Sequence, residues 1–288
     1  MMEMRHLAGT NLEVSALALD ISGPREQNLA QDEAELKHIV PAALELGINF
    51  LSVSSPDDEK SLRRVLSATP REQYILASEI NYAALSTLRG IEESLLRLDV
   101  EYLDIIFCRA DEPSRIDEIT SEILPALHSA RETGKVRFVG ISGSSLTHIQ
   151  TIIDRAPGLL QTVQVAGRYT LQNSSLAAFM PYLKDRQIGL ISTKPFGQEL
   201  LKDTSTEHLA SPEIAQKCDE AIAHCHRRGE SIEKLALQFA VANPWIAITP
   251  VHARDLSTLR QYVTWCHEEI DVGLLREVQT ILQPVRDL

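Results

Sequence analysis

The stretch EAELKHIVPAALELGINFLSV, residues 33–53, contains the pattern that governs the fold of this chain. Apolar residues recur at helical spacing from Glu33 to Leu46, and Gly47 then ends the helix. The run that follows, from Ile48 to Val53, is short and largely apolar, which is typical of a buried strand. The stretch therefore predicts a helix followed by a buried strand, which is one unit of an α/β protein.

The same alternation continues along the rest of the chain. We expect eight strands, near Leu17 and at residues 48–53, 74–78, 103–108, 136–142, 162–166, 189–193 and 247–251. Helical patterns lie between them, at residues 33–46, 86–98, 125–133, 146–155, 175–186, 212–228 and 232–242. Since no Pro/Gly/Ser-rich linker divides residues 1–288, we predict a single α/β domain, a (β/α)8 TIM barrel. Met4 to Leu17, with a Gly-Thr-Asn turn, predicts a hairpin that closes the barrel floor.

Composition narrows the class of partner. The 288 residues include 40 Asp and Glu against 28 Lys and Arg, a formal charge of −12 that argues against nucleic-acid binding. No stretch has the length of an apolar signal-peptide core or a membrane span, so we expect a cytoplasmic protein with no membrane partner. The four cysteines are too scattered for a disulfide framework. A small-molecule substrate is the expected partner, and the oligomeric state stays open.

Four groups of residues carry a resemblance to a known family. They are LELGINF at 44–50; ESLLRL at 93–98 with YLDII at 102–106; LPAL at 124–127 with GKVRFVGIS at 134–142; and SPEI at 211–214 continuing to KLALQF at 234–239. Over nearly its full length the chain resembles the aldo-keto reductases, and within them the L-galactose and related aldose dehydrogenases. The resemblance implies a TIM barrel that reduces carbonyls with a nicotinamide hydride.

The resemblance also implies a catalytic tetrad of Asp, Tyr, Lys and His, and this chain departs from it. In a gapless comparison those positions hold Ser52, Asp57, Glu79 and Arg109. A tyrosine hydroxyl protonates an alkoxide at neutral pH only if a nearby cation lowers its pKa, and here both the hydroxyl and the cation are replaced. The comparison predicts that hydride-transfer chemistry is lost.

The cofactor positions implied by the family depart as well. Its Asn after the fifth barrel strand corresponds to Gly143, its phosphate-binding Gly to His252, and its Glu-Asn pair to Gln261 and Tyr262. Arg254 still offers a phosphate contact. We therefore predict no cofactor, with NADP binding weakened by about a hundredfold or more.

Active sites of such barrels lie at the carboxyl ends of the strands, so we searched those ends for candidate side chains. The predicted catalytic residues are Glu79, Asp20, Arg109, Asp57 and Lys194. The predicted substrate-binding residues are Ser52, Asp58, Tyr82, Arg168 and His252. No metal site is predicted, because neither the histidines nor the cysteines have metal-ligand spacing.

Structural explanations compete with several of these assignments. Glu79 and Arg109 end adjacent strands, so they are expected to form an ion pair, which is compatible with either a structural or a catalytic role. Asp57 and Asp58 follow Pro56, where solvated turn acids are common. Cys108 alternates with Arg109 along a strand and should be a core thiol that faces the helices.

Three functions remain in competition at this point. The main hypothesis is a cofactor-independent lyase or isomerase that performs dehydration, isomerisation or cyclisation on a small oxygenated metabolite, with a carboxylate as base. The first alternative is a non-catalytic binding or regulatory protein. The second is an atypical NAD(P)-dependent oxidoreductase in which Asp57, Glu79, Tyr82 or Tyr169 replaces the missing phenol.

Overall fold

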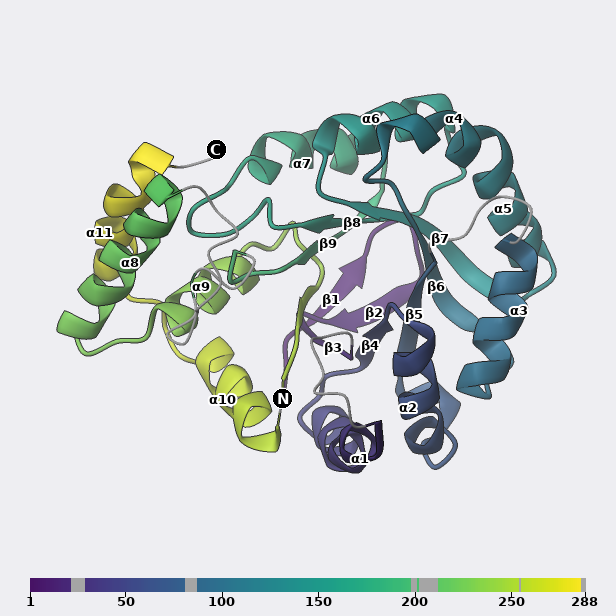
Figure 1. The fold of residues 1–288 in the computed structure, drawn as a ribbon, viewed down its shortest axis with the longest axis horizontal. Helices are drawn as coiled ribbons and strands as arrows, with labels where there is room; N and C mark the ends of the chain where they lie inside the picture. The colour runs from purple at the N-terminus through teal and green to yellow at the C-terminus, as the bar shows by residue number, and fades with distance from the viewer. Residues whose placement is uncertain (22–28, 81–86, 198–200, 202–211, 254, 286–288) are drawn as a thin grey trace.

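Eight parallel strands form a closed barrel surrounded by helices (Figure 1). The computed structural model describes residues 1–21, 29–80, 87–197, 201, 212–253 and 255–285. The strands are β3 Leu17–Asp20, β4 Phe50–Val53, β5 Ile75–Ile80, β6 Leu103–Arg109, β7 Val136–Gly143, β8 Thr162–Ala166, β9 Gly189–Thr193 and β10 Thr249–Val251. Their order is β10-β3-β4-β5-β6-β7-β8-β9, and a bridge between Ile191 and Ile248 joins the two ends. The predicted (β/α)8 barrel is confirmed.

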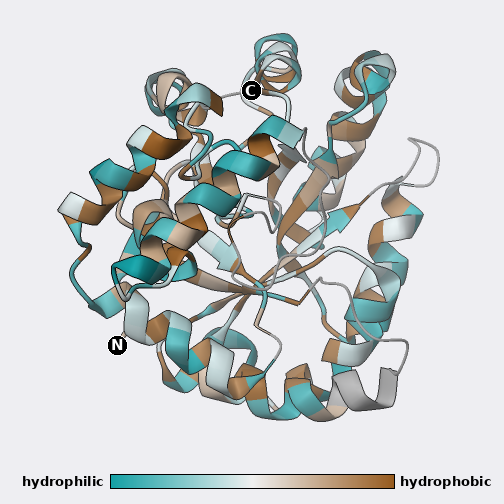
Figure 2. Cartoon of the chain, turned by 60° about the vertical axis from the view of Figure 1, so that its left-hand side comes forward, coloured by the Kyte–Doolittle hydropathy of each residue, from teal (hydrophilic) through white to brown (hydrophobic). Residues whose placement is uncertain are grey.

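The helices cover the outside of the barrel. They are α1 Leu29–Glu45, α2 Pro56–Leu66, α3 Thr87–Leu98, α4 Ile116–Glu118, α5 Leu124–Glu132, α6 Leu146–Arg155, α7 Leu176–Asp185, α8 Pro212–Arg227, α9 Ile232–Val241, α10 Leu256–His267 and α11 Val272–Leu282. Short turns complete the list: the 3-10 segments Arg71–Gln73, Pro113–Arg115 and Gln283–Val285, and a π-helical segment Ile119–Ile123. In Figure 2 the apolar faces of many helices turn toward the strands. No helix within the described ranges is long and apolar enough to cross a membrane.

The predicted hairpin at the barrel floor is also present. Strands β1 Met4–Leu7 and β2 Leu12–Ser15 pair antiparallel, with Leu7 opposite Leu12. Leu7 and Leu12 pack in one buried cluster with Phe50 and Phe107 from inside the barrel. The turn requires Gly9, because its φ is +73° and a Cβ there would lie 2.5 Å from the carbonyl oxygen of Gln161.

Alternation along each strand divides the core into two parts. Ala18, Phe50, Ala77 and Phe107 belong to the cluster inside the barrel, whereas their sequence neighbours belong to the larger cluster between strands and helices. Cys108 lies in that outer cluster, as predicted. The last inward side chain of each strand therefore points into the open carboxyl end of the barrel.

One local difference from the sequence prediction lies at residues 56–66. This segment was expected to begin as a loop, but it forms helix α2. The reason is a complete set of helix-start signals: the Ser55 side chain accepts from the Asp58 backbone N–H, Pro56 occupies the first turn, and acidic residues follow it. The Pro-Asp-Asp sequence is a helix start here and not a turn.

Candidate active site

The inward positions at the carboxyl ends of the strands form a polar layer. Because Ala18, Phe50, Ala77 and Phe107 face inward, the residues two positions later face inward too. The layer consists of Asp20, Ser52, Glu79, Arg109, Ser142, Gln164, Thr193 and His252. A barrel mouth lined in this way offers hydrogen-bond donors, acceptors and charge to a polar small molecule.

Glu79 and Arg109 form the predicted ion pair across β5 and β6. Arg109 Nε donates to Glu79 Oε1 at 2.9 Å, and Arg109 Nη2 donates to the same oxygen. The Glu79 side chain is 11% exposed and that of Arg109 is 48% exposed. Burial acts to lower the pKa of Arg109, but the charge and hydrogen bonds of Glu79 outweigh it and raise the pKa.

One oxygen of Glu79 and one nitrogen of Arg109 have no hydrogen-bond partner among the described residues. Both hydrogen bonds from Arg109 end on Oε1 of Glu79, and no described residue donates to Oε2. Arg109 likewise uses Nε and Nη2, so its Nη1 has no described partner. One carboxylate oxygen of Glu79 and one guanidinium nitrogen of Arg109 therefore retain hydrogen-bonding capacity for a ligand.

Asp20, Ser52 and His252 meet beside the ion pair, at the ends of the neighbouring strands β3, β4 and β10. Ser52 lies opposite Asp20 in the β3–β4 register, and its hydroxyl donates to Asp20 Oδ1 at 3.2 Å. His252 Nδ1 lies 3.3 Å from the backbone carbonyl oxygen of Asp20. The structure therefore brings these three predicted residues together, from three neighbouring strands.

Arg168 and Lys194 make hydrogen bonds within the loops at the mouth. Arg168 Nε donates to the Ser144 carbonyl oxygen at 2.7 Å, and Asp111 Oδ1 accepts from the Ser144 backbone N–H at 2.8 Å. These contacts tie together the loops that follow β6, β7 and β8. Lys194 follows β9 in the left-handed region, with φ +58°, and its carbonyl oxygen accepts from the Gly197 N–H.

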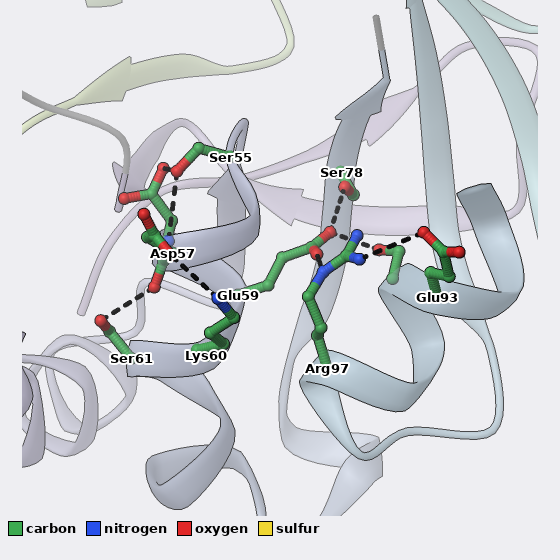
Figure 3. Close-up of polar contacts among 10 residues, drawn as sticks. Ser55, Asp57, Glu59, Lys60, Ser61, Ser78, Glu93 and Arg97 are labelled. Carbon is green, nitrogen blue, oxygen red and sulfur yellow. Dashed lines mark hydrogen bonds and ion pairs between the residues drawn. The ribbon is translucent and has the colours of Figure 1, made fainter. Parts of the chain in front are cut away.

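Asp57 and Asp58 lie in the first turn of α2, apart from the ion pair at the mouth. Asp57 is exposed and accepts from Lys60 Nζ at 3.0 Å, one turn along the helix. Asp58 is buried, and its Oδ2 accepts from the Ser55 hydroxyl at 2.6 Å. Figure 3 shows the contact between Asp57 and Lys60. Asp57 and Asp58 thus make helix-start contacts in place of the loop contacts expected from sequence.

Two tyrosines were also considered as proton donors. Tyr82 lies outside the described residues, as does Arg254. Tyr169 stacks on Phe239, with ring centroids 4.9 Å apart and an interplanar angle of 8°. Its ring is therefore held by packing against helix α9.

Sequence reasoning missed Ser142 and Gln164. Ser142 is buried at the inward end of β7, and its hydroxyl has no hydrogen-bond partner among the described residues. Gln164 lies opposite it in the β7–β8 register. A buried unpaired hydroxyl at a barrel mouth is a position for a ligand hydrogen bond, because leaving it unpaired costs free energy. The signal was the strand alternation Phe138, Gly140, Ser142, which places all three inside the barrel.

These two side chains also fit a nicotinamide. Its carboxamide carries both an N–H donor and a carbonyl acceptor, and a serine hydroxyl beside a glutamine amide matches that pair. No group of three or more metal-ligating side chains occurs in the part of the chain that the structure describes. The residues that would hold the carboxamide of a nicotinamide are Ser142 and Gln164.

Comparison with known proteins gives a consistent result. The model of the aldo/keto reductase family matches residues 22–282. The chain is 35% identical to L-galactose dehydrogenase of Arabidopsis thaliana, over 99% of this chain and 96% of that protein. It is 22% identical to D-threo-aldose 1-dehydrogenase of Pseudomonas sp, over 94% of this chain and 95% of that protein.

Solved structures show the same fold. The holo form of an aldo-keto reductase from Bacillus halodurans superposes with a TM-score of 0.83 at 18% identity, covering 100% of this chain and 98% of that one. Glycerol dehydrogenase from Gluconobacter oxydans gives a TM-score of 0.74 at 17% identity, with coverage of 99% and 96%. At this identity the likeness concerns the fold alone.

These findings overturn two sequence-based predictions. The cofactor-independent lyase or isomerase is wrong, because relatives that match nearly the whole chain are dehydrogenases by name. The predicted lack of a nicotinamide cofactor is wrong for the same reason. The sequence argument weighed losses at a few positions, yet each lost hydrogen bond contributes only about 1 kcal/mol, while a dinucleotide makes many contacts. The chain belongs to the aldo/keto reductase family.

Proposed function

We propose that this protein is a nicotinamide-dependent oxidoreductase that oxidises a hydroxyl of an aldose-type sugar, with the Glu79 carboxylate as the proton acceptor. The observation that carries the proposal is the Glu79–Arg109 pair, in which Oε2 of Glu79 has no described partner at the mouth of the barrel. The relatives named as L-galactose and aldose dehydrogenases support the substrate class.

Oxidation of a hydroxyl removes a hydride from carbon and a proton from oxygen. The nicotinamide, when bound, supplies the hydride acceptor. Glu79 Oε2 accepts the hydroxyl proton, a task for which an ionised carboxylate is suited at neutral pH. Arg109 orients the carboxylate through Oε1, and its Nη1 can donate to the substrate oxygen as negative charge develops there.

The same reasoning ranks the alternatives to the missing phenol. Asp57 is exposed and paired with Lys60 in α2, and Tyr169 is stacked on Phe239. Glu79 instead ends a barrel strand and points into the mouth, and strands position side chains more tightly than loops do. Among the candidates that the structure describes, Glu79 is the best placed base.

Other polar residues around the mouth suit a sugar substrate. Asp20, Ser52, Thr193 and His252 present carboxylate, hydroxyl and imidazole groups around the same opening. A site that hydrogen-bonds substrate hydroxyls discriminates strongly against analogues that lack them, since buried polar groups would be left unpaired. We therefore expect polyhydroxy substrates to be favoured over simple alcohols.

The test measures binding and turnover separately. NAD+ and NADP+ are titrated against the purified protein by calorimetry, and reduced nicotinamide is followed by absorbance with a panel of aldoses. Glu79→Gln should lower kcat by at least about 10²-fold. The matched control is Asp57→Asn, which makes the same kind of change at an exposed helix position and should keep kcat near the wild-type value.

Two results would refute the proposal. If an aldose binds but neither cofactor supports turnover, the protein is a non-catalytic binding member of its family. If Glu79→Gln keeps nearly full kcat while turnover is present, the base lies elsewhere.

A further inference from the structure

A second carboxylate lies on the opposite side of strand β5 from Glu79. Glu59 of α2 accepts three side-chain hydrogen bonds: from Ser78 Oγ of β5 at 3.1 Å, from Arg97 Nε of α3 at 2.6 Å, and from Ser94 Oγ of α3. Figure 3 shows Glu59 pointing between the strand and α3, with Arg97 also facing Glu93. We call Glu59, Ser78 and Arg97 the β5 anchor, and Ser94 adds a hydroxyl from α3 to the same carboxylate.

The β5 anchor is largely buried, and both oxygens of its carboxylate accept hydrogen bonds. The side chains of Glu59 and Arg97 are 5% and 18% exposed, and both serines are buried. Oε1 of Glu59 accepts the two hydroxyls, and Oε2 accepts the guanidinium. An ionised carboxylate, which is a pure acceptor, satisfies all three donors at once.

The anchor contacts β5 near its carboxyl end, at the residue where pairing with β4 stops. The β4–β5 register ends at the pair Val53 and Ser78, whereas the β5–β6 register continues to Ile80 and Cys108. At Glu79 the backbone is therefore paired with β6 alone. Ser78 is the last residue with partners on both sides, and its side chain points to the helices while that of Glu79 points to the mouth.

We propose that Glu59 is a positioning residue for Glu79: by holding Ser78 from behind, it fixes the end of β5 so that Oε2 of Glu79 meets the substrate. This inference rests on the proposed role of Glu79 as base. A link through one peptide unit is short enough that a shift of Ser78 shifts Glu79 with it, and a misplacement of about 1 Å can lower a rate by about 10²-fold.

Two serines provide a matched pair of variants. Ser78→Ala and Ser94→Ala each remove one hydroxyl that donates to the same oxygen of Glu59, and both positions are buried. Only Ser78 belongs to the strand that carries Glu79. Ser78→Ala should lower kcat by about tenfold with KM nearly unchanged, while Ser94→Ala should keep kcat within about twofold of wild type. Ser78→Thr restores a hydroxyl and should recover most of kcat.

A second measurement is independent of turnover. In protein labelled with ¹⁵N-arginine, the Nε–H signal of Arg109, assigned through Arg109→Lys, reports its hydrogen bond to Glu79 Oε1. Ser78→Ala should shift this signal and speed its exchange with water, and Ser94→Ala should leave it unchanged. Unfolding midpoints of the two alanine variants control for a general loss of stability.

The outcomes separate this inference from the proposed function. A protein without dehydrogenase turnover, in which Ser78→Ala alone disturbs the Arg109 signal, refutes the proposed function and leaves the anchor's effect on the Glu79–Arg109 pair established. Equal effects of Ser78→Ala and Ser94→Ala on the Arg109 signal or on kcat overturn the positioning role. An unaltered signal in both variants overturns it as well.

Discussion

Glu59 and Glu79 are both paired with an arginine, and they lie on opposite sides of strand β5. The pair behind the strand, Glu59 with Arg97, is enclosed between two helices, and both oxygens of Glu59 are occupied. The pair at the mouth, Glu79 with Arg109, is half-open, and one oxygen of Glu79 has no described partner. The comparison shows that the role of an ion pair depends on whether any of its donor or acceptor atoms remains without a hydrogen-bond partner.

A third carboxylate supports the distinction. Asp104 on β6 is buried near the barrel floor and accepts from Arg71, from Arg137 and from the Leu76 backbone N–H. The guanidinium of Arg71 also lies over the Tyr102 ring, with 4.0 Å to the centroid. Both carboxylate oxygens of Asp104 accept hydrogen bonds from other residues of the fold, as those of Glu59 do. Asp104 is therefore a structural residue and not a ligand-binding one.

The largest effect is expected for the alkylation rate of Cys108. This residue faces the helices from β6, whereas its neighbour Arg109 faces the mouth. Burial raises the pKa of the Cys108 thiol to about 12. At pH about 8 its thiolate fraction is then about 10⁻⁴, so iodoacetamide should alkylate it about a thousandfold more slowly than a free cysteine. Site-resolved mass spectrometry measures the rate, with urea-unfolded protein as the control. Similar rates in the folded and the urea-unfolded protein would show that the helix-facing side of β6 is accessible to the reagent.

Breaking the enclosed pair should affect stability more than breaking the open one. Arg97→Leu leaves the Glu59 charge buried without its cation, so the free energy of unfolding should fall by about 3 kcal/mol. Arg109→Leu removes a half-exposed partner and should cost at most about 1 kcal/mol. Urea unfolding measures both. If the two variants lose the same free energy, the distinction between an enclosed and an open pair is wrong.

Variants in the first turn of α2 test whether the active site extends to this helix. Ser55→Ala removes the helix cap and should lower the free energy of unfolding by about 1 kcal/mol. Asp57→Ala removes only an exposed contact with Lys60 and should change it by less than about 0.5 kcal/mol. The comparison uses thermal and urea unfolding, together with kcat. A large loss of kcat in Asp57→Ala with stability intact would extend the active site to α2.

The smallest effect is expected from Glu277 and its two cationic partners at the protein surface. Hydrogen bonds from His224 and from Arg228 hold the pKa of Glu277 on α11 below its ordinary value. A lowered folded-state pKa contributes stability above the unfolded pKa of about 4.3 and loses it as pH falls through the folded value. Unfolding measured between pH about 5 and about 3 should therefore show a slightly shallower decline in Glu277→Gln. An identical decline would show that solvent screens the pair completely.

Much of the fold was predictable because periodicity is a local property. Strand alternation and helical spacing located all eight barrel strands, and the pattern at residues 146–155 matched α6. The start of α2 was missed, because Pro-Asp-Asp is compatible with both a turn and a helix start, and the Ser55 cap that distinguishes them is a contact. The Glu79–Arg109 pair was predictable, since adjacent strand ends must lie side by side.

The sequence by itself determined the barrel, the inward order of side chains along each strand, and some of the residues at the mouth, but Ser142 and Gln164 were missed. Only the tertiary structure decided which carboxylates are enclosed and which are open. Glu59, nineteen positions before Ser78 in the numbering, looks in sequence like one more acid of a charged turn. Its role arises because α2, β5 and α3 pack around it. Burial and remaining hydrogen-bond capacity are set by neighbours that are distant along the chain, and no local pattern encodes them.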